Sequence, residues 1–150
     1  MKIFLGADHA GFSKKELVKK LLGEWGYEWE DKGAFEYDEN DDYPMFMKAV
    51  AMGVAGDLKN NIGIIFGGSG QGEAMVANAY AEQGVRAGVY YGKDLEIPRL
   101  LREHNDANIL SIGARRLDDK DMAAAIKIFL ETPFSGEERH KRRIAQFSKR

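Results

Sequence analysis

The segment FGGSGQGEA, residues 66–74, places a serine and a carboxylate among four glycines. A glycine turn that leads into a helix presents backbone N–H groups, and such groups favour an anion. Neither nucleotide-binding fingerprint is complete, because Glu73 stands where a Walker A lysine or the third glycine of a dinucleotide motif is required. A phosphate would be repelled by this carboxylate. An oxyanion that develops only during a reaction fits better, with Ser69 as an additional donor. The alternative is that Glu73 only complements the helix dipole.

Two histidines with polar neighbours are further candidates for chemistry. Asp8 and His9 follow an apolar run in GADHAGF, and the alternative to a functional role there is a cap on the next turn. His104 and Asn105 end a segment with helical spacing, where a packed histidine gives the same pattern. A histidine with a pKa near ~6.5 is the usual proton shuttle, so both pairs remain candidates.

The segment ERHKRR, residues 138–143, gathers cations near the C-terminus. At about 100° per residue, Arg139, His140 and Arg143 fall on one third of a helix. Two arginines one turn apart can grip a phosphate, whereas a solvated basic helix or an RNA-binding tail shows the same charge run. The three histidines lie far apart and no cysteine is present, so no metal site is expected.

Apolar strands alternate with amphipathic helices along the chain, and this alternation positions the candidates. Strands are expected at 2–7, 27–31, 62–66, 85–91 and 108–113, with helices at 43–56, 70–83, 94–104, 118–131 and about 136–150. The pattern predicts one domain over 1–150, a doubly wound, Rossmann-like α/β fold. Its five-stranded parallel sheet would carry helices on both faces and an extra C-terminal helix. Ligands bind at the carboxyl ends of such strands, so the turns after strands one, three, four and five, including Arg115, should line the site.

The composition limits the possible partners. A net charge of −2 gives no field that would draw the chain to nucleic acid or membrane. No apolar run approaches the ~20 residues of a membrane span, and the N-terminus lacks a signal-peptide pattern. The chain has no cysteine, which excludes thiolate chemistry and favours a cytoplasmic location.

Six motifs in order give the chain a specific resemblance, namely GADHAGF, DDYP, GGSGQGE, REHNDAN, IGARR and TPFSGEERHKRRI. Together they resemble the ribose-5-phosphate isomerase B family, which also contains the galactose-6-phosphate and allose-6-phosphate isomerases. The likeness extends to about Ile144. It implies interconversion of aldose and ketose phosphates without metal or cofactor. It also implies a homodimer, or a dimer of dimers, whose active sites are shared between subunits.

The resemblance implies roles for the candidate residues. His104 would open the sugar ring by proton transfer. The sugar itself would contact Asp8, Asn105 and Tyr43. The phosphate would be bound by His9, Arg115, Arg139 and Arg143, with His140 beside them. The arginines of the last helix are expected to reach into the site of the partner.

The base that moves the proton depends on the branch of the family. One branch carries a cysteine at the position of Gly67, and the other reads G-G-S-G-x-G-E and uses the glutamate. This chain matches the second branch, so Glu73 would take the C2 proton of the open-chain aldose and return it to C1 through a cis-enediolate. Helix-terminus amides are expected to keep Glu73 ionised. Ser69 and the turn built on Gly68, Gly70 and Gly72 would bind the developing oxyanion.

The substrate expected from the resemblance is ribose 5-phosphate, with ribulose 5-phosphate as product. A six-carbon sugar phosphate is the nearest alternative. A non-catalytic, flavodoxin-like phosphate-binding module is a further alternative, but it would not need Glu73, His104 and Asp8 together. The chain departs from the family at Ala79, where lysine is frequent, and in a slightly longer connection over 79–84. Both departures bear on packing or substrate shape rather than on the chemistry.

Overall fold

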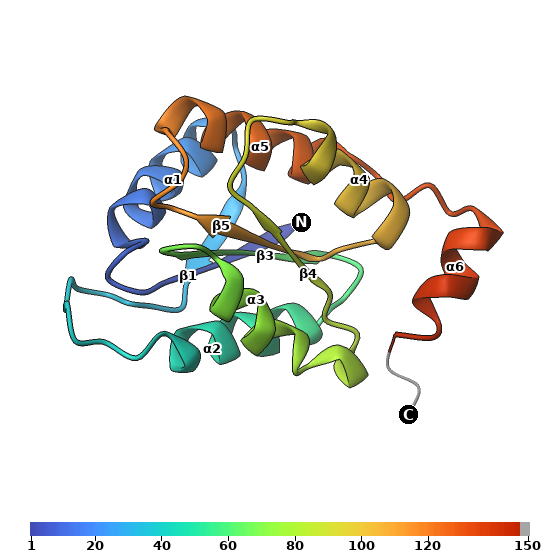
Figure 1. Cartoon of the computed structure of the whole chain (residues 1–150), viewed down its shortest axis with the longest axis horizontal. Coiled ribbons are helices and arrows are strands. Elements are labelled where there is room, and N and C mark those ends of the chain that lie inside the picture. Colours follow the sequence, from blue (N-terminus) through green and yellow to red (C-terminus); the bar gives the residue numbers. More distant parts are fainter. Residues whose placement is uncertain (148–150) are drawn as a thin grey trace.

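A parallel sheet of five strands lies between two layers of helices in the computed structural model, which describes residues 1–147 (Figure 1). The strands are β1 (Lys2–Ala7), β2 (Glu28–Asp31), β3 (Asn61–Gly67), β4 (Ala87–Tyr90) and β5 (Ile109–Gly113). Their order across the sheet is β2-β1-β3-β5-β4, and every neighbouring pair is parallel. The predicted doubly wound α/β fold is confirmed.

The helices divide between the two faces of the sheet. They are α1 (Phe12–Glu24), α2 (Tyr43–Ala55), α3 (Gln71–Asn78), α4 (Glu96–Asn105), α5 (Asp119–Glu131) and α6 (Glu138–Ile144), with a short 3-10 helix at Ala81–Gln83. α1 and α5 bury their apolar residues in one cluster, whereas α2 and α3 bury theirs in the other. α4 packs beside α5, and α6, which follows α5 in the chain, contacts α4 (Figure 1).

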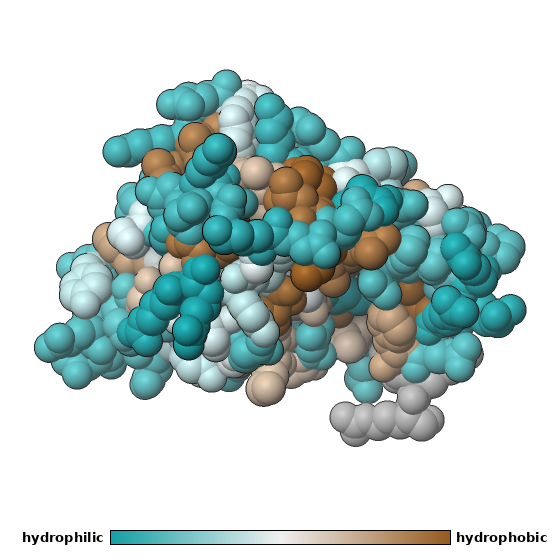
Figure 2. Space-filling view, turned by 45° about the horizontal axis from the view of Figure 1, so that its top comes forward, coloured by the Kyte–Doolittle hydropathy of each residue, from teal (hydrophilic) through white to brown (hydrophobic). Residues whose placement is uncertain are grey.

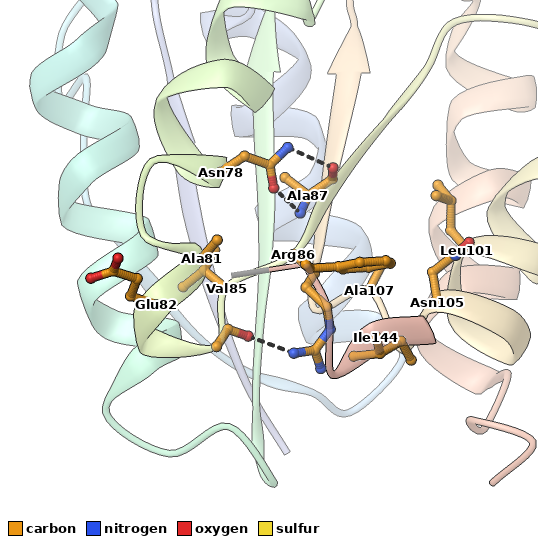
Figure 3. A pocket seen from close by; sticks show the side chains of 12 residues that line it. Asn78, Ala81, Glu82, Val85, Arg86, Ala87, Leu101, Asn105, Ala107 and Ile144 are labelled. Carbon is orange, nitrogen blue, oxygen red and sulfur yellow. Dashed lines mark hydrogen bonds between the residues drawn. The ribbon is translucent and has the colours of Figure 1, made fainter. Parts of the chain in front are cut away.

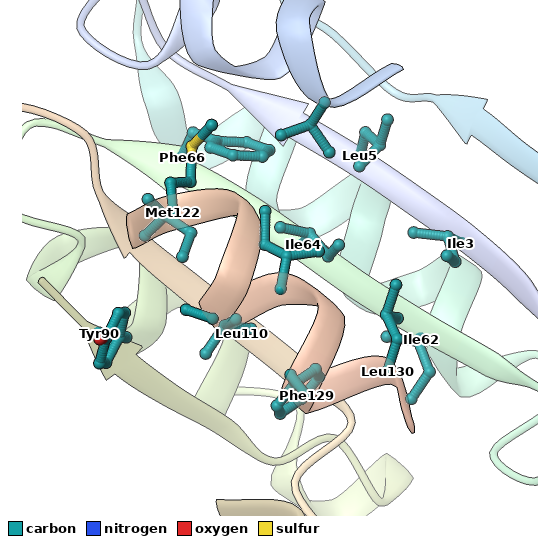
Figure 4. Close-up of a cluster of buried hydrophobic side chains, with 14 of the residues drawn as sticks. Ile3, Leu5, Ile62, Ile64, Phe66, Tyr90, Leu110, Met122, Phe129 and Leu130 are labelled. Atoms are coloured by element: carbon teal, nitrogen blue, oxygen red, sulfur yellow. The ribbon is translucent and has the colours of Figure 1, made fainter. Parts of the chain in front are cut away.

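Strand β3 shows why the sheet has two apolar faces. Ile62, Ile64 and Phe66 point into the cluster under α1 and α5, and Ile65 points into the cluster under α2 and α3. A strand that is covered on both faces needs apolar side chains in both directions, which explains its continuous apolar run. Figure 4 shows the first cluster, in which the β3 side chains meet those of α5 such as Phe129.

Two helix ends differ from the predictions. The apolar pattern predicts a helix over 70–83, but α3 ends at Asn78, whose side chain binds both the N–H and the carbonyl of Ala87 at 2.8 and 3.0 Å. These two hydrogen bonds hold the Asn78 side chain against β4, and the helix ends at this residue. The last helix begins at Glu138 rather than at 136 and ends at Ile144. Its predicted extension includes 148–150, which lie outside the described residues.

The ends of the sheet define two distant regions of the molecule. The chain leaves β1 toward β2 on one side and later places β3 on the other, so the carboxyl ends of β1 and β3 form a topological switch point. The long loop before α2 and helix α6 lie at opposite ends of the long axis (Figure 1).

Hydrophilic side chains cover most of the face in Figure 2, with apolar ones near its middle. None of the helices described for residues 1–147 is both long and apolar enough to cross a membrane.

Candidate active site

Glu73 is a buried carboxylate in the first turn of α3, and its residue is only 4% exposed. Its carboxyl group occupies the space next to the Cα of Gly67, so that a Cβ atom on Gly67 would overlap it. The last residue of β3 must therefore be glycine while Glu73 keeps this position. A cysteine at position 67 would overlap the present Glu73 carboxyl in the same way.

The environment of Glu73 shifts its proton affinity. Burial raises the pKa of its carboxyl, a hydrogen bond from its own backbone N–H opposes that effect, and the negative charge of Asp8 raises the pKa further. The backbone N–H lowers the pKa, as expected at a helix terminus, but desolvation has the larger effect, so the pKa of Glu73 is raised overall. The raised pKa of the Glu73 carboxyl lies closer to neutral pH. A general base is most effective when its pKa lies near the pH of the reaction.

The glycine turn is held in a shape that leaves donors available. Gly70 caps α3 with a φ of 78°, a left-handed conformation that favours glycine. Its carbonyl accepts a hydrogen bond of 2.7 Å from the Ser111 hydroxyl. The Ser69 oxygen accepts from the N–H of Gln71 at 3.3 Å, so the hydroxyl proton of Ser69 can be donated elsewhere. This arrangement suits an oxyanion near Ser69.

Two larger side chains lie against the same turn. The Nη1 atom of Arg115 lies 3.2 Å from the position of a Cβ on Gly68, and the Tyr43 hydroxyl lies 2.5 Å from that of a Cβ on Gly72. Glycine at both positions thus lets a cation and a phenol approach the backbone closely. A substrate that carries both a phosphate and hydroxyl groups could be contacted here by Arg115 and Tyr43.

The turn after β4 also reaches this region, as predicted from the topology. A cavity of about 340 Å³ beside the glycine turn is lined by Ser69, Gln71, Tyr91 and Arg116. Tyr91 follows β4 directly and Arg116 follows β5. Neither residue was identified as a site residue from the sequence, although both lie in turns that were expected to line the site.

Asp8 and His9 follow β1 on the other side of the switch point. Asp8 is 7% exposed, and one of its carboxylate oxygens accepts a hydrogen bond of 3.0 Å from the N–H of Gly11. Its capping role is therefore real, but the second oxygen remains for a ligand. Nδ1 of His9 lies 2.9 Å from Oδ1 of Asp41. Asp41 was not identified as a site residue from the sequence, and its only signal was its place in the DDYP motif.

His104 and Asn105 lie far from Glu73 within the chain. They end α4, and the chain then enters β5 at Ile109, whereas Gly67 pairs with Gly113 at the other end of β5. The five residues of β5 separate these levels by roughly 13 Å, at about 3.3 Å per residue. One chain therefore cannot bring His104 and Glu73 to the same small substrate.

Helix α6 places His140 against His104. The ring of His140 stacks on that of His104 with centroids 4.4 Å apart and planes 14° apart. Burial lowers the pKa of His140, and the nearby His104 lowers it further. Arg139 is exposed and pairs with Glu137 at 2.7 Å, and Arg143 is also exposed.

A cavity of about 500 Å³ opens beside Asn105 and lies between α6 and the end of α3 (Figure 3). Leu101, Asn105 and Ile144 line one side of it. The connection 79–84 lies on the opposite side and contributes Ala81, Glu82 and Gly84.

The site residues identified from the sequence thus form two groups. The carboxyl-end group consists of Asp8, His9, Tyr43, Ser69, Glu73 and Arg115, together with the turn glycines Gly68, Gly70 and Gly72. The amino-end group consists of His104, Asn105, Arg139, His140 and Arg143. Within residues 1–147, no group of three or more His, Asp or Glu side chains is placed to hold a metal ion.

Known proteins match this chain in sequence and in fold. A profile of the family described as Ribose/Galactose Isomerase matches residues 3–147. Ribose-5-phosphate isomerase B of Mycolicibacterium paratuberculosis is 40% identical over 144 residues, which cover 96% of this chain and 87% of that protein. The Escherichia coli enzyme of the same name is 35% identical over 95% of this chain and 91% of its own length.

A solved structure shares the fold over nearly the whole length of this chain. Ribose-5-phosphate isomerase B from Mycoplasma genitalium, crystallised with bound ribulose-5-phosphate, superposes with a TM-score of 0.90 and 32% identity. The superposition covers 97% of this chain and 92% of that chain. From the matching profile, the sequence identity and the shared fold, we conclude that this chain belongs to the ribose/galactose isomerase family.

Proposed function

We propose that this protein interconverts ribose 5-phosphate and ribulose 5-phosphate, with Glu73 as the base. The observation that carries this proposal is the position of Glu73: a buried carboxylate with a raised pKa, beside Asp8 and in front of the donors of the glycine turn. A structural helix-capping glutamate would be expected at the surface. The ribulose-5-phosphate bound to the Mycoplasma genitalium relative supports the choice of substrate.

The reaction requires one proton to move between neighbouring carbons. Ionised Glu73 takes the proton from C2 of the open-chain aldose, and the electron pair of that C–H bond forms the C1–C2 double bond of an enediolate. The carbonyl oxygen gains negative charge, which Ser69 and the N–H groups of the turn stabilise. Protonated Glu73 then returns the proton to C1, while the proton of the C2 hydroxyl passes to the C1 oxygen; this leaves a ketone at C2 and a hydroxyl at C1 and restores the carboxylate.

Two copies of the chain are needed for the complete site. The amino-end group cannot reach Glu73 within one chain, because β5 lies between them. In a homodimer, the partner would supply His104 for ring opening and Asn105 for a sugar hydroxyl. Its Arg139 and Arg143 would join Arg115 and His9 around the phosphate. Assembly into a dimer of dimers and a cytoplasmic location stay predictions from the resemblance.

The proposal is tested by turnover. Purified protein that has been treated with a chelator is incubated with ribose 5-phosphate and, separately, with allose 6-phosphate, and ketose formation is followed. We expect conversion of ribose 5-phosphate and much slower conversion of the six-carbon sugar. Faster turnover of allose 6-phosphate would assign the protein to the six-carbon alternative. Binding of either compound without turnover would identify a non-catalytic phosphate-binding module.

A further inference from the structure

Asp41 contacts His9 through two hydrogen bonds to a single carboxylate oxygen. Oδ1 accepts from the backbone N–H of His9 at 3.2 Å and lies 2.9 Å from the imidazole Nδ1. The carboxylate belongs to the loop before α2, 32 residues away in the sequence. A backbone donor and a ring donor on the same oxygen fix both the position and the rotation of the imidazole.

The hydrogen bond decides which ring nitrogen can face a ligand. A carboxylate oxygen only accepts, so the proton of His9 lies on Nδ1. In a neutral imidazole, Nε2 would then be an acceptor and would repel a phosphate oxygen. In the imidazolium, Nε2 carries a proton and donates. With Asp41 on Nδ1, His9 can therefore bind a phosphate only in its charged form.

The Asp41 side chain is buried and held in place beside His9. Its side chain is 7% exposed, and within residues 1–147 its second oxygen, Oδ2, is buried without a hydrogen-bond partner. The loop that carries it is anchored, because the buried Lys15 donates to the carbonyl of Ala34 at 2.7 Å. The ring of Tyr37 lies edge-on to that of His9, with centroids 6.5 Å apart.

We propose that Asp41 is a positioning residue that holds His9 as an imidazolium aimed at the phosphate of the substrate. The inference rests on the proposed function, since it takes His9 to be part of the phosphate site. It explains how a histidine contributes a cation at neutral pH beside the permanently charged Arg115. Asp41 does not touch the substrate and acts through His9 alone.

The charges around His9 support this role. The hydrogen bond to Asp41 raises the pKa of His9, partial burial opposes it, the charges of Asp8 and Asp41 raise the pKa further, and Arg115 lowers it. The contribution of His9 to phosphate binding is thus complete below its ordinary pKa and is lost as the pH rises through the raised value. In a protein without the Asp41 charge, His9 would lose its proton at a lower pH, and its contribution to phosphate binding would be lost at that lower pH.

The variant Asp41→Asn separates charge from geometry. Its amide oxygen can still accept both hydrogen bonds, but the negative charge is gone. We expect inorganic phosphate to bind roughly fivefold to tenfold more weakly than to wild type at pH 8, and within about twofold of wild type at pH 5.5. Phosphate itself also titrates over this range. Dividing the Kd of the variant by that of wild type at the same pH cancels this effect. For ribose 5-phosphate, KM should rise at pH 8 while kcat stays within about twofold.

The chain offers matched controls. Asp42 is the adjacent carboxylate but is exposed, so Asp42→Asn should leave the phosphate affinity unchanged. Only three histidines are present, so the titration of His9 can be followed by NMR in the free protein, independently of turnover. A double-mutant cycle with His9→Gln completes the set, because Asp41→Asn should have no further effect on phosphate binding once His9 is replaced.

Each outcome decides the proposal. A lower His9 pKa in Asp41→Asn, together with a phosphate deficit that grows with pH and vanishes in the His9→Gln background, supports it. An unchanged His9 titration contradicts it, and so does a lowered pKa with unchanged phosphate affinity. A deficit of equal size at all pH values, or one that persists without His9, shows that Asp41 acts only on the structure of the loop. Absence of isomerase turnover with the expected NMR and phosphate results would contradict the proposed function and not this inference.

Discussion

At the scale of single residues, Glu73 is subject to two opposing demands. Burial beside Asp8 favours its protonated form, whereas proton abstraction requires the carboxylate. At neutral pH the ionised group therefore reduces the stability of the folded protein, because its pKa is higher in the folded than in the unfolded chain. Such a conflict between stability and activity is common for residues that act in catalysis.

The variant Glu73→Gln removes the buried negative charge and, with it, the group that accepts the proton. We expect kcat for ribose 5-phosphate to fall by about 10²–10⁴, the usual contribution of a general base, with little change in KM. The melting temperature at pH 7 should rise, since no buried charge remains. Steady-state kinetics and thermal unfolding measure both effects. Glu24→Gln, at an exposed carboxylate that ends α1, is the control and should change neither. Full activity of Glu73→Gln would show that another group is the base.

The raised pKa of Glu73 also sets the acid limit of the reaction. Only ionised Glu73 can accept the C2 proton, so kcat should fall as the pH decreases through the raised pKa. The midpoint should lie above the ordinary glutamate value of 4.5. A pH profile of kcat, with unfolding monitored in parallel, measures this midpoint. Activity that persists unchanged to the ordinary glutamate value contradicts the assigned environment.

Gly67 provides a steric test of the same carboxylate. A methyl group at this position overlaps the Glu73 carboxyl, so Gly67→Ala must displace the base. We expect kcat to fall at least about tenfold, since small misplacements of reacting groups carry large rate penalties. Gly23→Ala is the matched control, because nothing lies within 4 Å of its Cβ position in α1. It should leave activity unchanged and stabilise the protein slightly. Equal activity of the two variants would remove Glu73 from its assigned place.

At the scale of the elements, a buried ion pair connects α1 to β2 and to the loop that carries Asp41. The Nζ atom of Lys15, which is fully buried, lies 2.5 Å from Asp31 at the end of β2 and also binds the carbonyl of Ala34. Burial opposes ionisation of Asp31, but the hydrogen bonds from Lys15, the Gly33 N–H and Lys19 leave its pKa lowered overall. The Asp31 carboxylate therefore stays ionised at neutral pH.

Breaking this pair should loosen the edge of the sheet. Lys15→Met leaves the Asp31 carboxylate without its buried partner, and we expect a loss of roughly 2–4 kcal/mol in the free energy of unfolding. Urea denaturation at pH 7 measures this loss, with the exposed Lys20→Met as the control. The difference between wild type and Lys15→Met should shrink as the pH falls through the lowered pKa of Asp31. A loss below about 0.5 kcal/mol, as for surface pairs, would contradict the role of the pair.

The elements themselves follow largely from the sequence, because each strand and helix carries its own apolar pattern. The boundaries that were wrong depend on contacts between elements. α3 ends where the side-chain amide of Asn78 binds Ala87 on β4. The apolar pattern within the helix cannot predict this contact, because it depends on a neighbouring strand. The position of His104, by contrast, follows from topology alone, because a helix that precedes a parallel strand ends at the amino edge of the sheet.

The site shows the same division. Glu73 could be identified from the sequence because its glycine turn is local and lacks a phosphate-binding lysine. Asp41 could not, because the loop contains five acidic residues and only the folded chain selects one of them for His9. The five are Glu36, Asp38, Glu39, Asp41 and Asp42. The direction of the Glu73 pKa shift was also beyond reach, since it depends on the depth of burial and on Asp8.

At the scale of the whole molecule, the proposed site is divided between the two ends of the sheet. The carboxyl-end group holds the base and the amino-end group holds the ring-opening histidine and two arginines. A dimer with twofold symmetry joins each group to its complement twice, so it creates two identical sites. The exposed basic face of α6 then serves the partner and not its own chain.

The most direct test of this account is the mixing of two inactive variants. Glu73→Gln lacks the base, and the double variant Arg139→Ala/Arg143→Ala lacks the phosphate arginines. In a heterodimer with shared sites, one site carries both defects and the other carries none. An equal mixture after proven subunit exchange should therefore recover about one quarter of the wild-type activity. No recovery despite proven exchange would contradict a site that is built from two chains around Glu73.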